Sequence, residues 1–374
     1  MKTMSNDEIN QLPTILNILD QIAAEEEGLR NNTRWSFLSN LGAEDKFEIF
    51  QESPDGPCVL KPTTSCFNSY FRGQTQYFNY CRPVLYRDER KDKIERFIDR
   101  IRSSEFELLL QTHPFVKLVY EQGIVFKNFG EDIWNQLNVN YLGLAQHYEL
   151  ETELLDFTSD KWVAAFFATC IKKKGKYIPI DEHEDEVRFG VVYRYTLPPE
   201  NLLPSNENLN YKNNFSIIGL QPFKRPGEQK GFALQLDERE NLNHIHGIEK
   251  YLFRHDKLAA EIIYNRMNQG KDLFPPDELE ELTLKIKTSK KISNNAFKLA
   301  FDKYPVIQMD EGLVRSACIR KGYKFVNYPI VNFAKGIETA FLKNWKKEGE
   351  NEFFSKIVYR PVYLPPDNAN YTNL

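Results

Sequence analysis

The stretch WVAAFFATCIKKKGK, residues 162–176, is almost entirely apolar over its first ten positions and then strongly cationic. A segment that is apolar on every face is typical of a helix buried in a core, and lysines favour the negative end of a helix dipole. We therefore predict a buried helix from about Asp160 to Lys172, with Phe166 and Phe167 in the core.

The patterns on either side of this helix indicate an α+β fold. Residues 7–30 and 91–118 repeat apolar side chains with helical spacing, and His113-Pro114 is expected to interrupt the second helix. RFGVVYRYTL, residues 188–197, is rich in β-branched and aromatic residues, which favours a strand. Because no regular βαβ alternation is present, we predict N-terminal helices followed by central antiparallel or mixed β-sheets.

Composition limits the class of protein. The 374 residues exceed the usual size of one domain, and 41% of them are hydrophobic, which favours a folded chain. The longest apolar run, residues 162–171, is far shorter than the ~20 residues of a membrane-spanning helix, and the N-terminus has no apolar signal-peptide core. We predict a soluble, cytoplasmic protein without a membrane partner.

Neither the five cysteines nor the six histidines have the usual spacing of a metal site. NHIH, residues 243–246, would place His244 and His246 on one side of a strand, and we interpret this pair as structural or solvent-exposed. The cysteines are interpreted as reduced and mostly buried. We therefore predict no metal.

Charge divides the chain into two parts. Residues 285–374 contain sixteen Lys and Arg against eight Asp and Glu, a net charge of +8, which leaves −12 for residues 1–284. The basic part also contains the aromatic residues Tyr323, Phe325, Tyr328, Phe333, Trp345, Tyr359 and Tyr363. Cations interleaved with aromatics could bind single-stranded nucleic acid. We favour the simpler interpretation that these aromatics form a small core with lysines on its solvated face.

Polar residues stand among apolar neighbours in three further places. Gln146 and His147 precede the predicted buried helix, and Asp156, Thr158 and Ser159 stand directly before it, where a hydroxyl or carboxylate could also cap the helix. KRPGEQKGFAL, residues 224–234, places Arg225, Glu228 and Gln229 before a predicted strand, although an ordinary polar turn would have the same composition.

These segments resemble the FRG-domain family, named for a Phe-Arg-Gly triplet that is Phe71-Arg72-Gly73 here. YFRGQ (70–74), RPVLYR (82–87), AQHYELETELLDFTSDKWVAAFFA (145–168), RPGEQKGFAL (225–234) and KDLFPPDELEELTLKI (271–286) occur in the family's order. The resemblance implies a domain over residues 61–287, between an N-terminal helical segment (1–60) and a basic, aromatic-rich extension (288–374). Glu149, Glu151 and Glu153 stand near positions where the family has Gly, Pro and Arg, and Phe157 replaces Trp.

The order of motifs also resembles, more weakly, that of ADP-ribosyltransferases, which implies a split sandwich of sheets and NAD as substrate. The implied NAD-binding residues are Arg72, Gly73, Gln74, Arg87, Thr158, Ser159 and Arg225, with Gln146 and Asp156 supporting them. Gly73 would allow close approach of the ligand to the backbone. The implied catalytic residues are His147, Gln229 and Glu228. Because neighbouring residues on a strand face opposite sides, only one of Glu228 and Gln229 could enter the site, and Gln229 matches the family position.

We expect Arg72, His147, Thr158 and Gln229 to line one pocket. Arg72 would then clamp an anion; the alternative is a buried ion pair with a carboxylate such as Asp156. The resulting hypothesis is an ADP-ribosyltransferase-like effector, a toxin or a phage-defence protein, which modifies a protein or a nucleic acid. An inhibitory partner protein is compatible with this hypothesis. The alternative is a nucleotide- or RNA-binding module, or an RNA-processing phosphotransferase or nuclease, in which Arg72, Arg87, His147 and Arg225 hold phosphate.

Overall fold

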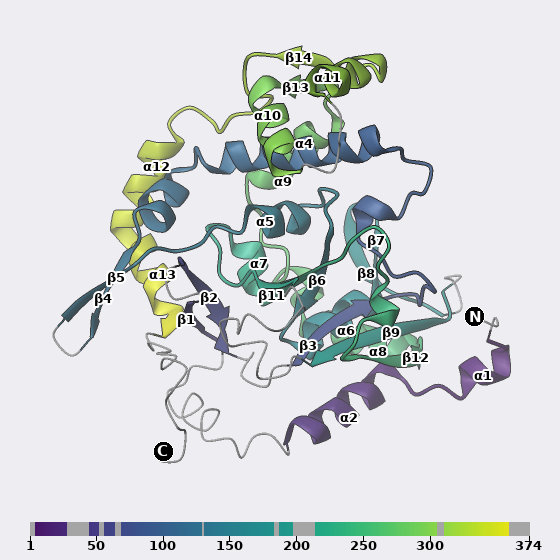
Figure 1. Ribbon diagram of the computed structural model, residues 1–374. Helices are drawn as coiled ribbons and strands as arrows, with labels where there is room; N and C mark the ends of the chain where they lie inside the picture. Colours follow the sequence, from purple (N-terminus) through teal and green to yellow (C-terminus); the bar gives the residue numbers. More distant parts are fainter. Residues whose placement is uncertain are drawn as a thin grey trace, which may run out of the picture.

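A six-stranded antiparallel sheet organises the protein (Figure 1). The computed structural model describes residues 4–27, 45–51, 56–63, 69–128, 131–182, 187–196, 214–304 and 310–358. The strand order is β10-β11-β6-β3-β9-β12, with bounds Ser69–Gln74 (β3), Leu154–Thr158 (β6), Phe189–Thr196 (β9), Phe215–Ile217 (β10), Gly231–Gln235 (β11) and Ile248–Arg254 (β12). The predicted α+β class is confirmed, and the strand predicted over residues 188–197 is β9.

The two middle strands, β3 and β6, pair over a very short length. Their register contains the single pair Phe71–Thr158, whereas β3 pairs with β9 along all six of its residues. The sheet is therefore split between β3 and β6 on one side of this pair. Backbone groups along the split need partners other than the neighbouring strand.

Helices cover one face of the sheet, where α2 (Ile15–Glu27), α6 (Lys161–Thr169) and α8 (Lys257–Arg266) share a hydrophobic core with Phe71 and Val192. On the other face Tyr70, Phe157 and Phe232 form a second core. Successive residues of β3 thus point to opposite faces, as strand geometry requires. The N-terminal helical region is divided at Pro13 into α1 (Asn6–Asn10) and α2.

The buried helix is shorter than predicted. α6 ends at Thr169, and the following residues form a hairpin of β7 (Cys170–Lys173) and β8 (Lys176–Pro179). Lys174 and Gly175 both have positive φ, 50° and 79°, as a two-residue hairpin turn requires. The prediction of helix as far as Lys172 is therefore wrong, and the lysines project from a hairpin.

Phe166 and Phe167 have different surroundings. Phe166 is completely buried against the rings of Tyr264 and Phe274, whereas Phe167 is half-buried and lines a cavity described below. The prediction that both belong to the core is right for Phe166 and right only in part for Phe167, which packs against the same core but also borders that cavity.

We expect Phe166→Ala to lower the free energy of unfolding by about 3–5 kcal/mol, because the lost ring leaves a cavity that its rigid neighbours cannot fill. Urea denaturation would measure this loss. Phe167→Ala is the matched control and should cost clearly less, since it only enlarges an existing opening. Equal losses for the two variants would contradict the difference in burial.

Further helices surround the sheet, and one long helix, α4 (Lys93–Leu110), ends before His113-Pro114 as predicted. The other helices are α5 (Tyr141–His147), α7 (Lys224–Glu228), α9 (Leu279–Thr288), α10 (Asn294–Lys303), α11 (Glu311–Arg320), α12 (Ile337–Asn344) and α13 (Glu350–Ser355). Shorter 3₁₀ and π turns lie at Val84–Tyr86, Val116–Glu121, Leu242–His244, Asn268–Gly270 and Trp345–Gly349. The small sheets contain β1 (Phe47–Gln51), β2 (Cys58–Pro62), β4 (Ile124–Asn128), β5 (Glu131–Asn135), β13 (Lys291–Ser293), β14 (Lys324–Val326) and β15 (Ile357–Val358).

The basic C-terminal part is built into the rest of the fold. β15 pairs with β1, and α10 and α11 share a hydrophobic core with α4. Tyr323, Phe325, Phe333 and Trp345 all pack in hydrophobic clusters, Tyr328 is exposed, and Tyr359 and Tyr363 lie outside the described residues. The interpretation of these aromatics as core residues is therefore favoured for four of the seven.

The described cysteines and histidines agree with their predicted environments in part. Cys58, Cys81, Cys170 and Cys318 are free and buried, as predicted, while Cys66 lies outside the described residues. The two histidines of NHIH are exposed, and His244 ends a 3₁₀ turn, so the predicted strand is wrong there. Across the described ranges, no helix has both the length and the hydropathy to cross a membrane.

Candidate functional site

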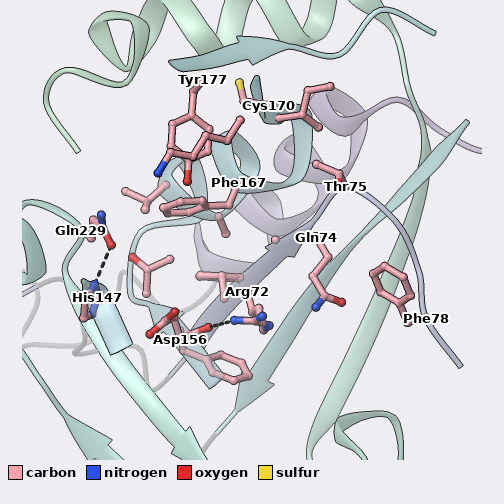
Figure 2. A pocket seen from close by; sticks show the side chains of 18 of the residues that line it. Arg72, Gln74, Thr75, Phe78, His147, Asp156, Phe167, Cys170, Tyr177 and Gln229 are labelled. Atoms are coloured by element: carbon pink, nitrogen blue, oxygen red, sulfur yellow. Dashed lines mark hydrogen bonds between the residues drawn. The ribbon is translucent and has the colours of Figure 1, made fainter. Parts of the chain in front are cut away.

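A cavity of about 470 Å³ lies where β3 and β6 separate, next to α6 and the β7–β8 hairpin (Figure 2). Its lining contains eight of the twelve predicted site residues: Arg72, Gly73, Gln74, Arg87, His147, Asp156, Thr158 and Gln229. The structure thus brings Arg72, His147, Thr158 and Gln229 together across 157 positions of sequence. The volume is in the range of small-molecule sites.

Arg72 spans the split in the sheet. Its guanidinium donates a hydrogen bond to the backbone carbonyl of Asp156 over 2.8 Å, which satisfies an oxygen that β3 leaves unpaired (Figure 2). The Asp156 carboxylate makes no ion pair with it, so the alternative of a buried Arg72–Asp156 ion pair is wrong. Nε of Arg72 is buried without a partner among the described residues, and the side chain lines the cavity.

Arg87 adds a second guanidinium at the rim of the same cavity. Its Nε donates to the carbonyl of Arg82 over 2.9 Å. Partial removal of water by the surrounding protein, followed by repulsion from Arg72, lowers the pKa of Arg87, which still remains protonated at neutral pH. Among the described residues, no carboxylate lies within ion-pair distance of Arg72 or Arg87. Two such guanidinium groups side by side favour an anionic ligand.

Asp156 supplies the cavity with a carboxylate that is held in a fixed orientation. Gln146 donates from Nε2 to Asp156 Oδ2 over 3.0 Å, and the oxygen of Gln146 accepts from the hydroxyl of Thr152 over 2.6 Å. Oδ1 of Asp156 is buried without a hydrogen-bond partner in the described part of the chain. Gln146 itself does not line the cavity, so it positions Asp156 from behind.

His147 and Gln229 form a buried pair at one end of the cavity. Gln229 donates from Nε2 to the carbonyl of Leu273 over 2.9 Å, which makes its Oε1 the acceptor for His147 Nδ1, also at 2.9 Å. The ring therefore carries its proton on Nδ1. Nε2 of His147 is buried, and a Cβ added to Gly231 would lie only 2.9 Å from it. This geometry lets His147 position Gln229, and the catalytic role of His147 stays a prediction.

We expect this pair to produce a pH dependence of stability. Burial, the largest influence, lowers the pKa of His147 below its ordinary value of 6.5. The unfolded chain thus binds a proton at higher pH than the folded chain, so this contribution to stability is complete above pH 6.5 and is lost as the pH falls below it. Urea denaturation from about pH 7.5 to about pH 5.5 should show a flatter profile for His147→Gln than for the wild type. His246→Gln, at an exposed site, should keep the wild-type slope, and parallel profiles for all three proteins would contradict this assignment.

Besides Gln146, three predicted residues lie outside the cavity for clear structural reasons. Residues 224–228 form helix α7, and Gln229 caps its end, so strand alternation does not apply to Glu228 and Gln229. Glu228 is exposed and lies 3.6 Å from Lys356, which makes the prediction of a catalytic Glu228 wrong in position. Ser159 is buried behind the cavity, where its backbone N–H donates to the carbonyl of Lys230 over 3.3 Å.

Arg225 is the third of these residues and lies behind the His147–Gln229 pair. It donates to the carbonyl of His147 over 3.1 Å and stacks on the rings of Tyr148 and Phe274, 4.5 and 5.5 Å from their centroids. It lines a neighbouring cavity instead of the first one.

Gly73 and Thr158 line the cavity but have structural tasks of their own. A Cβ on Gly73 would lie 1.8 Å from the carbonyl oxygen of Ala164, so this glycine permits close packing of β3 against α6, not the predicted approach of a ligand. The hydroxyl of Thr158 accepts from the N–H of Asp160 over 3.0 Å, and Asp160 caps α6. Both contacts fix the position of α6 beside the split.

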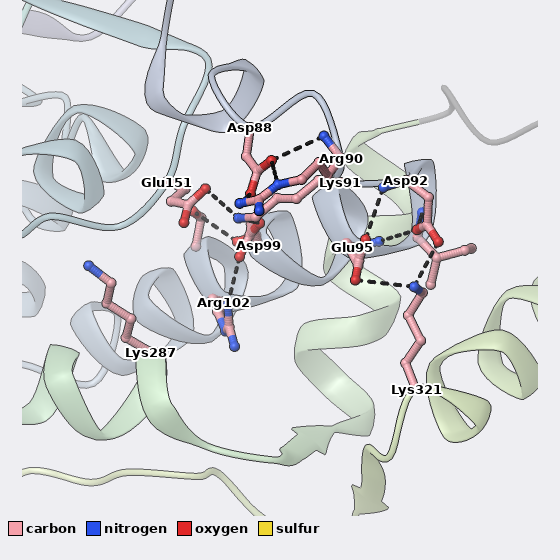
Figure 3. A network of polar contacts seen from close by, with 12 residues as sticks. Asp88, Arg90, Lys91, Asp92, Glu95, Asp99, Arg102, Glu151, Lys287 and Lys321 are labelled. Atoms are coloured by element: carbon pink, nitrogen blue, oxygen red, sulfur yellow. Dashed lines mark hydrogen bonds and ion pairs between the residues drawn. The ribbon is translucent and has the colours of Figure 1, made fainter.

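The three glutamates that depart from the FRG-domain pattern lie near cations. Glu149 has φ +65°, a conformation that glycine adopts more easily, and its carboxylate pairs with Lys172. Lys91 holds both Glu151 and Asp99 of α4, at 2.6 and 2.9 Å (Figure 3). Glu153 is buried; burial raises its pKa, and the nearby charge of Arg100 opposes that shift. These contacts attach the segment before β6 to α4 and to the β7–β8 hairpin.

Sequence reasoning missed the aromatic wall of the cavity, formed by Phe78, Phe167 and Tyr177. Phe78 is 48% exposed, and Tyr177 stacks on Phe274 with 4.7 Å between ring centroids. Burial raises the pKa of Tyr177 to about 12, so its hydroxyl stays protonated at neutral pH. Only the hairpin brings Tyr177 back over α6, and the sequence had predicted helix as far as Lys172 in place of the first strand of that hairpin.

Together the split antiparallel sheet and its cationic, aromatic-walled cavity define an α+β protein with a pocket suited to an anionic, planar ligand. A family model of the FRG domain matches residues 68–176, the segment that contains Arg72, Arg87, His147, Asp156 and Thr158 and ends directly before Tyr177. The predicted resemblance to the FRG-domain family is thereby confirmed for this segment. No curated protein and no solved structure matches the chain.

Proposed function

We propose that the cavity binds NAD as a substrate and that the protein transfers ADP-ribose from it to a macromolecular acceptor. The observation that carries this proposal is the pair of guanidinium groups, Arg72 and Arg87, which lack carboxylate partners among the described residues and face an aromatic wall. The two guanidinium groups could each donate two parallel hydrogen bonds to a pyrophosphate, and a planar ring of the ligand could stack on Phe78, Phe167 or Tyr177.

In this proposal Asp156 takes the place that we had predicted for Glu228, because it is the carboxylate on the cavity wall. The bond between ribose C1′ and the nicotinamide nitrogen breaks, and its electron pair leaves with neutral nicotinamide. The acceptor's nucleophile then forms a bond to C1′, and its proton passes to a base such as Asp156. A fixed carboxylate stabilises the positive charge that develops on the ribose, as carboxylates do in glycoside hydrolysis.

The other polar residues would hold this geometry. Gln146 orients Asp156, and the His147–Gln229 pair fixes the loop after α7 against α5. Gln74 and Thr158 offer further polar groups along the wall.

The experiment uses NAD carrying separate labels in nicotinamide and in the adenylate phosphate. We expect the purified protein, mixed with a cell extract, to release labelled nicotinamide and to leave the phosphate label in a macromolecular fraction. Absence of nicotinamide release under all conditions would overturn the proposal.

One observation favours the alternative of a nucleotide- or RNA-binding module: both functional atoms of the Gln229 amide already have partners within the protein. Thermal unfolding separates the two hypotheses, because a ligand that binds only the folded state raises the melting temperature. Stabilisation by NAD supports the transferase. Stabilisation by a short RNA, with none by NAD, supports the binding module.

A further inference from the structure

A second cavity of about 400 Å³ adjoins the first at the β7–β8 hairpin. The two cavities share Lys172 and Tyr177 in their linings. One side chain, Tyr177, therefore presents its ring between both spaces, and a ligand in the second cavity would lie next to a ligand in the first.

Positive charge dominates the second cavity and its border. Lys172, Lys176, Lys271 and Arg225 line it, and Lys173 and Lys174 extend the series along the exposed hairpin. Lys176 and Lys271 have no ion pair with any described residue. The one acidic residue of the lining is Glu280, which is largely exposed and 3.8 Å from Arg225.

Arg225 is a buried cation at the back of this cavity. It is only 4% exposed, its Nε has no partner among the described residues, and its other nitrogens contact the His147 carbonyl and, weakly, Glu280. A buried guanidinium whose carboxylate partner is largely exposed and 3.8 Å away favours a further anion in the space that it faces.

Aromatic faces accompany these cations. Tyr177 and Phe274 are stacked with an interplanar angle of 14°, and Tyr264 lines the same cavity. Cations that follow a backbone, together with rings on which bases stack, are the means by which proteins hold single-stranded nucleic acid. A duplex would expose few base faces to such rings, and a peptide acceptor would need no such row of lysines.

We infer that the acceptor is a single-stranded nucleic acid whose backbone follows the lysines of the β7–β8 hairpin and whose base enters beside Tyr177. This inference rests on the proposed function, which places NAD in the first cavity. The nucleophile is then a nitrogen or oxygen of the bound nucleotide. It attacks ribose C1′ as nicotinamide leaves, and its proton passes to Asp156.

The test measures binding without NAD, by fluorescence anisotropy of labelled single strands of about twelve nucleotides. We expect the double variant Lys176→Glu and Lys271→Glu to bind about tenfold more weakly, and the slope of log K against log salt to fall by about 0.7 for each lost phosphate contact. Both lysines are exposed, so thermal unfolding should be unchanged. The matched control is Lys298→Glu with Lys343→Glu, the same charge change in the basic C-terminal part.

The control variant should bind as tightly as the wild type. Equal losses in both variants, tighter binding to a duplex of the same sequence, or no binding at all would overturn the inference.

A second readout is the transfer of labelled ADP-ribose from NAD to the oligonucleotide, followed through the label in the adenylate phosphate. This transfer should be lost in the Lys176→Glu and Lys271→Glu variant only. Nicotinamide release without oligonucleotide binding would overturn the nucleic-acid acceptor while supporting the transferase. Oligonucleotide binding without nicotinamide release would support the nucleic-acid site and count against the transferase.

Discussion

Replacing Arg72 with alanine should lower the rate of nicotinamide release by about a hundredfold to a thousandfold, the effect of removing one preorganised charged donor from an active site. Arg72 contacts the split in the sheet through one hydrogen bond, to the carbonyl of Asp156. Loss of that bond costs about 1 kcal/mol, and removal of the repulsion with Arg87 offsets part of it. The melting temperature should therefore fall by about 2–4 °C at most.

One variant distinguishes the bidentate geometry of the Arg72 guanidinium from its charge, and a second variant is the control. Arg72→Lys keeps a cation but cannot make two parallel hydrogen bonds to phosphate oxygens, so most of the activity should still be lost. Arg320→Ala removes an exposed arginine at the end of α11 and should leave the rate unchanged. Full activity in Arg72→Ala, or activity lost only because the protein no longer folds, would contradict the role of Arg72 as an anion clamp.

Local pattern predicted much of this fold. The β-branched and aromatic run at residues 188–197 became β9, and the apolar run at residues 162–169 became α6, because both are buried and their side chains follow the period of one kind of element. The end of α6 could not be predicted from the apolar pattern. Cys170 and Ile171 are as apolar as the helix before them, and only the turn at Lys174-Gly175 shows that the chain reverses there.

The candidate site was predictable where polar residues stood among apolar neighbours. Such side chains need partners, and Arg72, His147, Asp156, Thr158 and Gln229 meet theirs at one cavity. Glu228 was misplaced because a short helix, not a strand, precedes β11. The aromatic wall was missed for a different reason: apolar rings in an apolar run give no sign of which of them will face a cavity.

Replacing Gly73 with alanine should have the largest effect on stability, a loss of at least about 5 kcal/mol, beyond the usual range of single substitutions. The added Cβ would lie 1.8 Å from the carbonyl oxygen of Ala164 and 2.8 Å from the backbone nitrogen of Ala168. These are backbone atoms of a buried helix, so no side-chain rotation can relieve the overlap. α6 would have to move away from β3, which would disturb the core around Phe71 and the wall of the cavity together.

Urea denaturation of Gly73→Ala, compared with Gly322→Ala, separates this overlap from the general effect of replacing glycine. Gly322 has φ +88° and no atom within 4 Å of an added Cβ, so its replacement carries only backbone strain, about 1–2 kcal/mol. If Gly73→Ala cost no more than Gly322→Ala, β3 and α6 could not be packed as closely as the structure has them. The cavity would then lose the wall that holds Arg72 opposite Phe167, and both the proposed NAD site and the proposed acceptor path beside it would need another position in the fold.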